Sequence, residues 1–375
     1  MKELQKRVWA EISLGHIEHN LAQLRRWLPE GCRCMGVVKA DAYGHGSTQV
    51  AHTLEQAGAD YLGVYCLDEA AALRLDGITM PILIFGHTPA QYIGDVLDFG
   101  LTQTVADAGS AAAYAQAAKA DGRTLRVHIK VDTGLTRYGF CATGTHFEEC
   151  VQQVEDVCRT DGLEVEGIYT HFAVSDEEGE FNHQYTLDQY ALFQRLLERV
   201  EADGFHIPIR HCSNTGAIVY YPEMAMDMVR AGNVLYDLGD EEDRLGLQTT
   251  FTLKAKISAV RMVDADTYIS YGLTYKTRQP ERIGIVDAGY GDGLPRSISN
   301  HFRVWTKDGF AEQRGRLCMD TFMVDLTALP DVGEGDTVEI FGPHASIHEL
   351  AAAAKTIPEE FYCSVTKRVP RIYIK

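Results

Sequence analysis

A lysine closes a short apolar run near the N-terminus. Lys39 follows Gly36, Val37 and Val38, a run typical of a buried strand. If its side chain is desolvated there, its pKa falls and the amine can attack a carbonyl carbon to form a Schiff base. A lysine that extends into solvent fits the same position, so position alone leaves both interpretations open.

Two later segments carry groups that can bind a phosphate. Asn214, Thr215 and Gly216 follow one apolar run, and Gly232 and Asn233 follow another. They offer backbone amides and a hydroxyl of the kind that barrels use for phosphate, although either segment alone also fits an ordinary turn. A Schiff-base lysine together with a phosphate-binding segment indicates pyridoxal 5'-phosphate (PLP), an aldehyde that carries a phosphate.

Three histidines on separate apolar runs are the candidates for a metal site. His128, His171 and His211 could bind zinc from three strands. No run carries two histidines one residue apart, so their convergence is not indicated, and we expect no catalytic metal. Cys32 and Cys34 form a close pair that we interpret as ordinary side chains.

These residues need a scaffold that brings strand ends together. From Met35 to about Gly239, β-rich apolar runs alternate with amphipathic stretches. The expected strands are 36–40, 61–65, 82–85, 102–106, 126–132, 165–172, 207–212 and 227–231, and helical segments include 47–56, 68–75, 110–120, 147–159 and 187–202. This alternation predicts a (β/α)8 barrel, whose sites lie at the C-terminal strand ends. An open doubly wound sheet is the alternative, but the glycine-rich fingerprint expected after its first strand is missing.

Beyond about residue 239 the pattern changes to strand-like runs separated by turns. These runs are 251–263, 267–271, 283–288, 302–307, 321–326 and 337–341, with one clear helix over 346–354. We therefore expect an α/β barrel over residues 10–239 and a β-rich C-terminal domain over 240–375, with residues 1–9 packing against the second. The acidic stretch 240–243 is the expected linker.

The amino-acid composition argues against several classes of binding protein. The 375 residues are 45% hydrophobic and 23% charged, and their net charge of -18 argues against binding to nucleic acid or an anionic membrane. We see no signal peptide and no apolar run long enough to span a bilayer. The 9 cysteines are scattered without a disulfide framework, which favours free thiols and a cytoplasmic location.

The run over 38–46, Val-Lys-Ala-Asp-Ala-Tyr-Gly-His-Gly, resembles the PLP-attachment motif of the alanine racemase family. Further matches follow in the same order along nearly the whole chain: 130–134, Arg137, 170–172, 211–214, 229–230, 270–272, 289–290, 318–320 and 368–371. The resemblance implies a PLP-dependent isomerase that interconverts L- and D-alanine and supplies a D-amino acid for peptidoglycan. It also implies the barrel and the β-rich domain together.

The resemblance further implies two catalytic bases. Lys39 would bind the cofactor and exchange the Cα proton of the D enantiomer, and Tyr271 of the partner subunit would exchange that of the L enantiomer. Racemisation requires a base on each face, because a single base tends to return the proton to the side it came from. A homodimer with shared active sites follows.

The remaining roles are carried over in the same way. Arg230 would face the pyridine nitrogen of the cofactor, and as a permanently charged group it cannot give that nitrogen a proton. The other implied cofactor contacts are Tyr43, His171, Asn214, Thr215, Gly232 and Asn233. The substrate carboxylate would be bound by Arg137 and the backbone amide of Met319, and the supporting residues are Lys130 (carbamylated in many members), His211 and Tyr290.

One position departs from the family pattern. Lys367 stands where a tyrosine usually precedes Arg-Val-Pro-Arg. Serine racemases tied to vancomycin resistance are similar proteins with a smaller polar residue there, so serine is an alternative substrate. Two other functions remain open: a Schiff-base aldolase, which would need neither PLP nor a second domain, and a non-catalytic PLP carrier, which would not need Tyr271.

Overall fold

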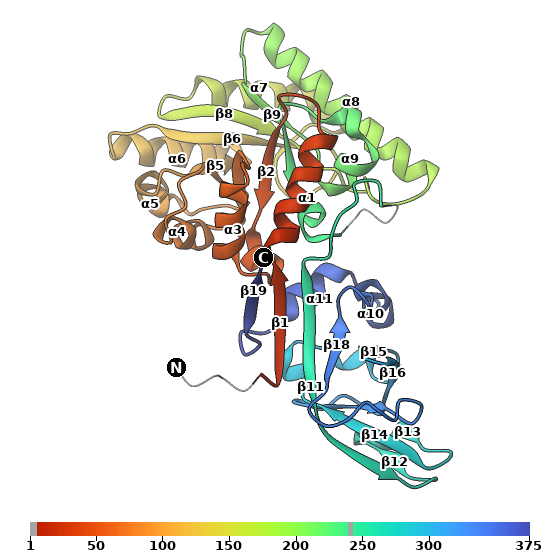
Figure 1. Ribbon diagram of the computed structural model, residues 1–375. Coiled ribbons are helices and arrows are strands. Elements are labelled where there is room, and N and C mark those ends of the chain that lie inside the picture. The colour runs from red at the N-terminus through yellow and green to blue at the C-terminus, as the bar shows by residue number, and fades with distance from the viewer. Residues whose placement is uncertain (1–5, 239–242) are drawn as a thin grey trace. The chain divides into compact units, whose positions relative to one another are not determined.

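The structure is a computed structural model that describes residues 6–238 and 243–375 (Figure 1). Its chain forms two compact units. The barrel unit consists of the described residues of Ile17–Ala42 and Ser47–Gln248. The β-rich unit consists of the described residues up to His16, of Tyr43–Gly46 and of Thr249–Lys375. The domain boundaries expected at residues 10 and 240 stay a prediction, and residues 240–242 of the expected linker lie outside the described residues.

In the barrel unit, eight parallel strands of the described residues follow one another in the order β10-β2-β3-β4-β5-β6-β8-β9. They are β2 (Arg33–Val37), β3 (Tyr61–Val64), β4 (Ile82–Ile84), β5 (Thr102–Val105), β6 (Leu125–Asp132), β8 (Leu163–Tyr169), β9 (Ile209–His211) and β10 (Met228–Ala231), and the short β7 (Phe140–Cys141) pairs with β6. Backbone bonds from Asp227 N to Arg210 O (3.1 Å) and from Arg230 N to Ser213 O (3.0 Å) join the two ends of this order. The closed ring confirms the predicted barrel.

Helices lie on the outside of the ring, where α1 precedes the first barrel strand and the others follow barrel strands (Figure 1). They are α1 (Leu14–Trp27), α3 (Ser47–Gln56), α4 (Leu67–Leu75), α5 (Ile93–Asp98), α6 (Ala108–Ala120), α7 (Phe147–Arg159), α8 (Glu180–Ala202) and α9 (Thr215–Tyr220). Three of these helices were not predicted: α1 precedes the alternating pattern, and α5 and α9 are too short to show a helical period. The sequence analysis also placed the start of α8 at residue 187 instead of Glu180.

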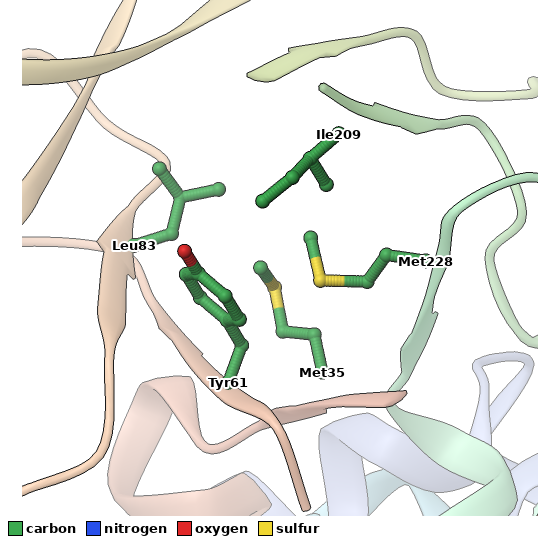
Figure 2. Packing of buried hydrophobic residues seen from close by; sticks show 5 residues of the cluster. All are labelled: Met35, Tyr61, Leu83, Ile209 and Met228. Atoms are coloured by element: carbon green, nitrogen blue, oxygen red, sulfur yellow. The ribbon is translucent and has the colours of Figure 1, made fainter. Parts of the chain in front are cut away.

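An apolar cluster fills part of the barrel interior (Figure 2). Met35, Tyr61, Leu83, Ile209 and Met228 come from five different strands, and none is more than 5% exposed. Strands buried on both faces read as continuous apolar runs, which is why the sequence shows no alternation there. Burial of each such side chain contributes roughly 1.5–3 kcal/mol, so the cluster fixes the strands whose ends carry the site.

The β-rich unit is built on a long bent strand. β11 (Phe251–Val263) pairs with β18 (Thr337–Phe341) near its start and with β14 (Glu281–Val286) near its end. β17 (Phe322–Asp325), β16 (Gly309–Arg314) and β15 (Arg303–Thr306) complete the ring between those two, and β1 (Val8–Ser13) and β19 (Arg371–Ile374) extend the sheet beyond β11. In the first half of β11 the side chains alternate between buried and partly exposed, as expected for a sheet with one covered face.

Several elements of this unit differ from the expectation. The strand expected over 267–271 is only β12 (Tyr268–Ile269), paired with β13 (Tyr275–Lys276), and Tyr271 begins the short helix η5 (Tyr271–Leu273). The sequence analysis missed β1, β16, β19 and the helix α11 (Pro358–Ser364), while α10 (Ile347–Ala354) is the helix it expected. None of the described helices has the length and apolarity needed to cross a bilayer.

Candidate active site

Lys39 opens a left-handed turn directly after the first barrel strand. β2 ends at Val37, short of the expected residue 40, and residues 40–43 have φ angles of 52°, 56°, 52° and 54°. This conformation costs roughly 1–2 kcal/mol for each residue other than glycine. Strain of this kind persists only where the surroundings hold it, and it is found mostly at functional sites.

Two carboxylates hold this turn. Oε1 of Glu69 accepts a bond from Ala40 N (2.7 Å), and Oδ1 of Asp41 accepts one from Ser47 N (2.8 Å). The second oxygen of Glu69 accepts from Tyr65 N (2.7 Å). Glu69 lies in the first turn of α4, so it ties the turn after β2 to the end of β3.

A buried guanidinium lies on the inner side of the barrel. Arg230, on β10, is 4% exposed. Its Nη1 donates to Nδ1 of His211 (3.0 Å), and its Nη2 lies 2.9 Å from the carbonyl oxygens of Thr170 and Cys212 and 3.0 Å from Nδ1 of His171. A guanidinium can only donate, so both imidazoles accept through Nδ1 and carry any single proton on Nε2.

The electrostatics of this group follow from burial. Burial lowers the pKa of His171 and of His211 well below the usual value, and the charge of Arg230 lowers both further. Burial also lowers the pKa of Arg230 to about 10, which leaves it charged at neutral pH. The group is therefore a fixed cation between neutral acceptors.

Lys130 is a second buried cation-forming group in the barrel. It lies on β6, is 4% exposed, and its Nζ is 4.6 Å from the centre of the Tyr169 ring. Burial lowers the pKa of Lys130 well below the usual value, and the charges of Arg230 and Arg137 add to this effect. Desolvation therefore favours the neutral form of the Lys130 amine, while Arg137 is exposed in the loop after β6.

The loops after β9 and β10 contact each other. Oγ1 of Thr215 accepts a bond from Val234 N (3.3 Å), and Gly232 and Asn233 lie at the start of the same short helix as Val234. The side chain of Asn214 caps α9 by accepting a backbone bond (3.2 Å), so its side-chain oxygen is used within the fold. Backbone groups and the Thr215 hydroxyl are the donors that this pair of loops offers to a ligand.

The β-rich unit exposes large side chains on three loops. Tyr271 is 66% exposed, Tyr290 is 41% exposed and Met319 is 52% exposed. The hydroxyl of Ser270 donates to Arg316 O (2.6 Å), which joins the first of these loops to the third. The β-rich unit therefore leaves three large side chains exposed on loops that contact one another.

Asp292 anchors the second of these loops. Its carboxylate is buried and lies 3.0 Å from Nε of Arg368, and Gly291 N donates to Met319 O (2.8 Å). Lys367 is exposed and directly precedes Arg368. Tyr290, Met319 and Lys367 are therefore held near one another within the β-rich unit.

The predicted site residues fall into two groups. The barrel unit holds Lys39, Lys130, Arg137, His171, His211, Asn214, Thr215, Arg230, Gly232 and Asn233, all on or just after the ends of barrel strands. The β-rich unit holds Tyr43, Tyr271, Tyr290, Met319 and Lys367. Lys39 and Tyr271, the two predicted bases, thus belong to different compact units.

The histidines of the zinc alternative do not gather as metal ligands. Nδ1 of His171 and Nδ1 of His211 both accept from Arg230, and Nε2 of His211 lies 2.9 Å from Nδ1 of His128. Within residues 6–238 and 243–375, no three His, Cys, Asp or Glu side chains are grouped as a metal site.

Sequence reasoning missed three residues that shape the site. Glu69 holds the turn after Lys39, Tyr169 underlies Lys130, and Glu166 lies next to His128. Glu69 had a weak signal, an acidic residue in the first turn of a helix that follows a barrel strand. Glu166 also had one, a carboxylate inside a run otherwise expected to be buried.

The chain matches family models over most of its length. Residues 12–239 match "Alanine racemase, N-terminal domain" and residues 250–373 match "Alanine racemase, C-terminal domain". An alanine racemase of Desulfovibrio desulfuricans is 40% identical over 100% of both chains, and one of Desulforamulus reducens is 41% identical over 99% of this chain and 100% of its own. Among solved structures, alanine racemase of Clostridium difficile 630 is 36% identical with a TM-score of 0.91, covering 99% of this chain and 97% of its own.

Replacing Glu69 should loosen the turn after Lys39. We expect Glu69→Ala to lower the free energy of unfolding by about 1–3 kcal/mol, because two backbone amides lose a charged acceptor. The measurement is chemical denaturation of both proteins. The matched control is Asp68→Ala, which removes an exposed carboxylate of the same helix turn and should change stability by less than about 0.5 kcal/mol. Equal losses of stability in the two variants would show that Glu69 does not hold the turn after Lys39.

Proposed function

The chain belongs to the alanine racemase family, and from that premise we propose that it is a PLP-dependent isomerase that interconverts L- and D-alanine. The family is PLP-dependent. One observation carries the proposal for this chain: the strand of the buried Arg230 is the neighbour of the strand that leads to Lys39, with Ala231 paired to Gly36. The D-alanine formed would serve peptidoglycan synthesis.

The residues of the barrel fit PLP in three respects. Lys39 supplies an amine for the aldehyde, and Thr215 and the backbone amides around Gly232 and Asn233 supply donors for the phosphate. Arg230 supplies a fixed cation for the ring nitrogen, and it keeps its proton because its pKa stays near 10. His171 and His211 hold Arg230 in place. Bound PLP would supply an electron sink for the charge left on Cα when its proton leaves.

Two side chains would move the proton at Cα. Nζ of Lys39 would act on one face of the substrate, and Oη of Tyr271 of the partner subunit would act on the other. A single base tends to return the proton to the face it came from, so inversion requires both. The exposed hydroxyl of Tyr271 is available to a second molecule.

A homodimer with shared active sites is part of this proposal. We propose that a second copy of the chain contacts the exposed loops of Tyr271, Tyr290 and Met319. The backbone amide of Met319 of the partner subunit would then join Arg137 in binding the substrate carboxylate, and Tyr290 of the partner subunit would line the access path. Tyr43 would contribute a hydroxyl to the phosphate.

Lys130 has a supporting role in the proposal. A buried neutral amine reacts with carbon dioxide to form a carbamate, and the lowered pKa of Lys130 favours this form. The resulting negative charge would orient Arg137, whose own charge already influences the Lys130 amine.

The alternative functions are less well supported. The β-rich part of the chain also matches an alanine racemase family model, in addition to the barrel. A Schiff-base aldolase would not need this second domain. The relatives named above are alanine racemases, which does not favour serine as the main substrate. The proposed location is the cytoplasm, since all cysteines of the chain are free thiols.

Lys39 should carry the cofactor covalently. Reduction of the PLP-loaded protein with borohydride, followed by peptide mapping, should place the adduct on Lys39. Lys39→Ala should retain no covalent PLP and should lose racemase activity, because it loses both the attachment point and one base. Lys130→Ala is the control and should keep the adduct on Lys39. An adduct on Lys130 in the wild type would overturn the assignment.

Tyr271 should be needed for proton removal from L-alanine. We expect Tyr271→Phe to slow exchange of the Cα proton of L-alanine with deuterated water by about 100- to 10,000-fold, the usual loss for a positioned acid–base group. Tyr268→Phe removes the hydroxyl of another exposed tyrosine of this unit and should leave the exchange rate unchanged.

A mixed dimer tests whether the site is shared. In a dimer of one Lys39→Ala chain and one Tyr271→Phe chain, one of the two sites retains both bases. Mixing the inactive variants should therefore restore part of the racemase activity. Exchange of subunits without any return of activity would show that both bases come from one chain.

Lys367 should influence the choice between alanine and serine. A tyrosine there would pack beside the substrate side chain, whereas a flexible lysine leaves room for a hydroxymethyl group. We expect Lys367→Tyr to shift the ratio of kcat/KM toward alanine by up to about 10- to 200-fold, the range for one group in an adaptable pocket. Lys307→Tyr, at an exposed turn of the same unit, should leave the ratio unchanged. An unchanged ratio in both variants would show that Lys367 does not influence the choice between alanine and serine.

A further inference from the structure

A chain of side chains leads from Arg230 into the barrel interior, away from the strand ends. Nη1 of Arg230 lies 3.0 Å from Nδ1 of His211, and Nε2 of His211 lies 2.9 Å from Nδ1 of His128. Nε2 of His128 then lies 3.4 Å from Oε2 of Glu166, a contact too long and poorly aligned to be a full hydrogen bond. Both imidazoles are fully buried.

Arg230 at one end of this chain and the Glu166 carboxylate at the other both favour the same order of donors. Arg230 can only donate, so Nδ1 of His211 is an acceptor and its Nε2 carries the proton. That proton points to Nδ1 of His128, which must also be an acceptor. His128 therefore carries its proton on Nε2 and directs it at Glu166. Three donors in succession point from Arg230 toward the carboxylate.

The charges around this chain fit that arrangement. Burial lowers the pKa of His128 and of His211, so both are neutral. Burial alone would raise the pKa of Glu166, but the nearby His128 and Tyr61 side chains and the charge of Arg126 outweigh it and lower the pKa to about 2. Glu166 is therefore an ionised acceptor at the end of the chain.

Groups from three other strands also face Glu166. Oγ1 of Thr102 on β5 lies 3.2 Å from its Oε2, and Nη1 of Arg126 on β6 lies 4.0 Å from its Oε1. Tyr61 on β3 is close enough to Glu166 to lower the pKa of the carboxyl. Tyr61 also belongs to the apolar cluster of Figure 2. In the described part of the chain, Nε2 of His128 has no better partner than Glu166.

Gly167, the residue after Glu166, leaves room for the imidazole of His128. A Cβ on Gly167 would lie 2.6 Å from Cε1 and from Nδ1 of His128, closer than real atoms approach. The backbone of Gly167 has a negative φ and does not itself require glycine. The absence of a side chain at residue 167 is therefore needed to accommodate the ring of His128.

We propose that Glu166 is a positioning residue for Arg230, which it holds through His128 and His211 by fixing the tautomer of each. Without an acceptor at residue 166, the proton on Nε2 of His128 is buried without a partner. The tautomer with the proton on Nδ1 then gains population, although it opposes the proton on Nε2 of His211. His211 then changes tautomer as well and presents a proton to Arg230, which must move. The predicted effect on catalysis rests on the proposed function, whereas the predicted tautomers of the two histidines do not depend on it.

The test is a long-range proton–nitrogen NMR spectrum of protein labelled with 15N in histidine. In the wild type at about pH 8, above the ordinary pKa of histidine, His128 and His211 should both be neutral with the proton on Nε2. Variants His128→Gln and His211→Gln assign the signals. A proton on Nδ1 of either ring, or a charged ring, overturns the proposal without any need for a Glu166 variant.

Three substitutions then test the cause. Glu166→Leu should produce Nδ1-protonated His128 and lower kcat by up to about 100-fold with little change in KM, as for a misplaced group that does not bind substrate. Glu166→Gln keeps an acceptor and should restore the wild-type tautomers and most of kcat. Gly167→Ala should disturb the same signals by displacing the ring of His128.

A matched control separates this role from general stability. Glu164→Gln removes an exposed carboxylate of the same strand and should leave the spectrum and kcat unchanged. If Glu166→Leu folds and keeps the wild-type tautomers, Glu166 does not position Arg230. If the wild-type protein racemises no amino acid but shows the expected tautomers, the proposed function fails and the inference about the histidines stands.

Discussion

The site depends on one buried cation that is held by neutral acceptors. Transfer of a guanidinium out of water is costly unless its donors are satisfied. Within the described residues, the guanidinium of Arg230 contacts two carbonyl oxygens and two imidazoles. This arrangement requires both imidazoles to be neutral and to have one particular tautomer, so the charge of Arg230 dictates the protonation of its neighbours.

The same cation influences the rest of the barrel interior. Its charge adds to burial in lowering the pKa of Lys130, and it lies 5.3 Å from the centre of the Tyr169 ring. Its strand pairs with β2, so Arg230 and the strained turn after Lys39 share one side of the ring. A cation of fixed direction and a lysine on a rigid turn together give the barrel two preorganised groups for one ligand.

Much of this could be predicted from the sequence, and the reasons differ between elements. Barrel strands such as β3 and β4 are continuous apolar runs because both their faces are buried, and Lys39 and Arg230 stand out as charges at the ends of apolar runs. The left-handed turn over residues 40–43 could not be predicted, because it contains no glycine and is held by Glu69 from the next helix. Propensity describes a residue and its neighbours in sequence, whereas this turn depends on a contact between two loops.

The chain of histidines shows a second limit. His128, His171 and His211 were considered together as zinc ligands because they lie on separate strands. Their spacing does not reveal that an arginine occupies the acceptor nitrogen of two of them. The position of a proton on a ring depends on partners from several strands, which only the folded barrel brings together.

The central claim is that Arg230 is a protonated cation whose two histidine partners accept through Nδ1. Neutron diffraction from deuterium-exchanged crystals observes this directly, because deuterium atoms scatter strongly. We expect a fully protonated guanidinium and an Nδ1 without deuterium on both His171 and His211, with deuterium on Nε2. Deuterium on Nδ1 of either ring would contradict the account, because Arg230 would then face another donor.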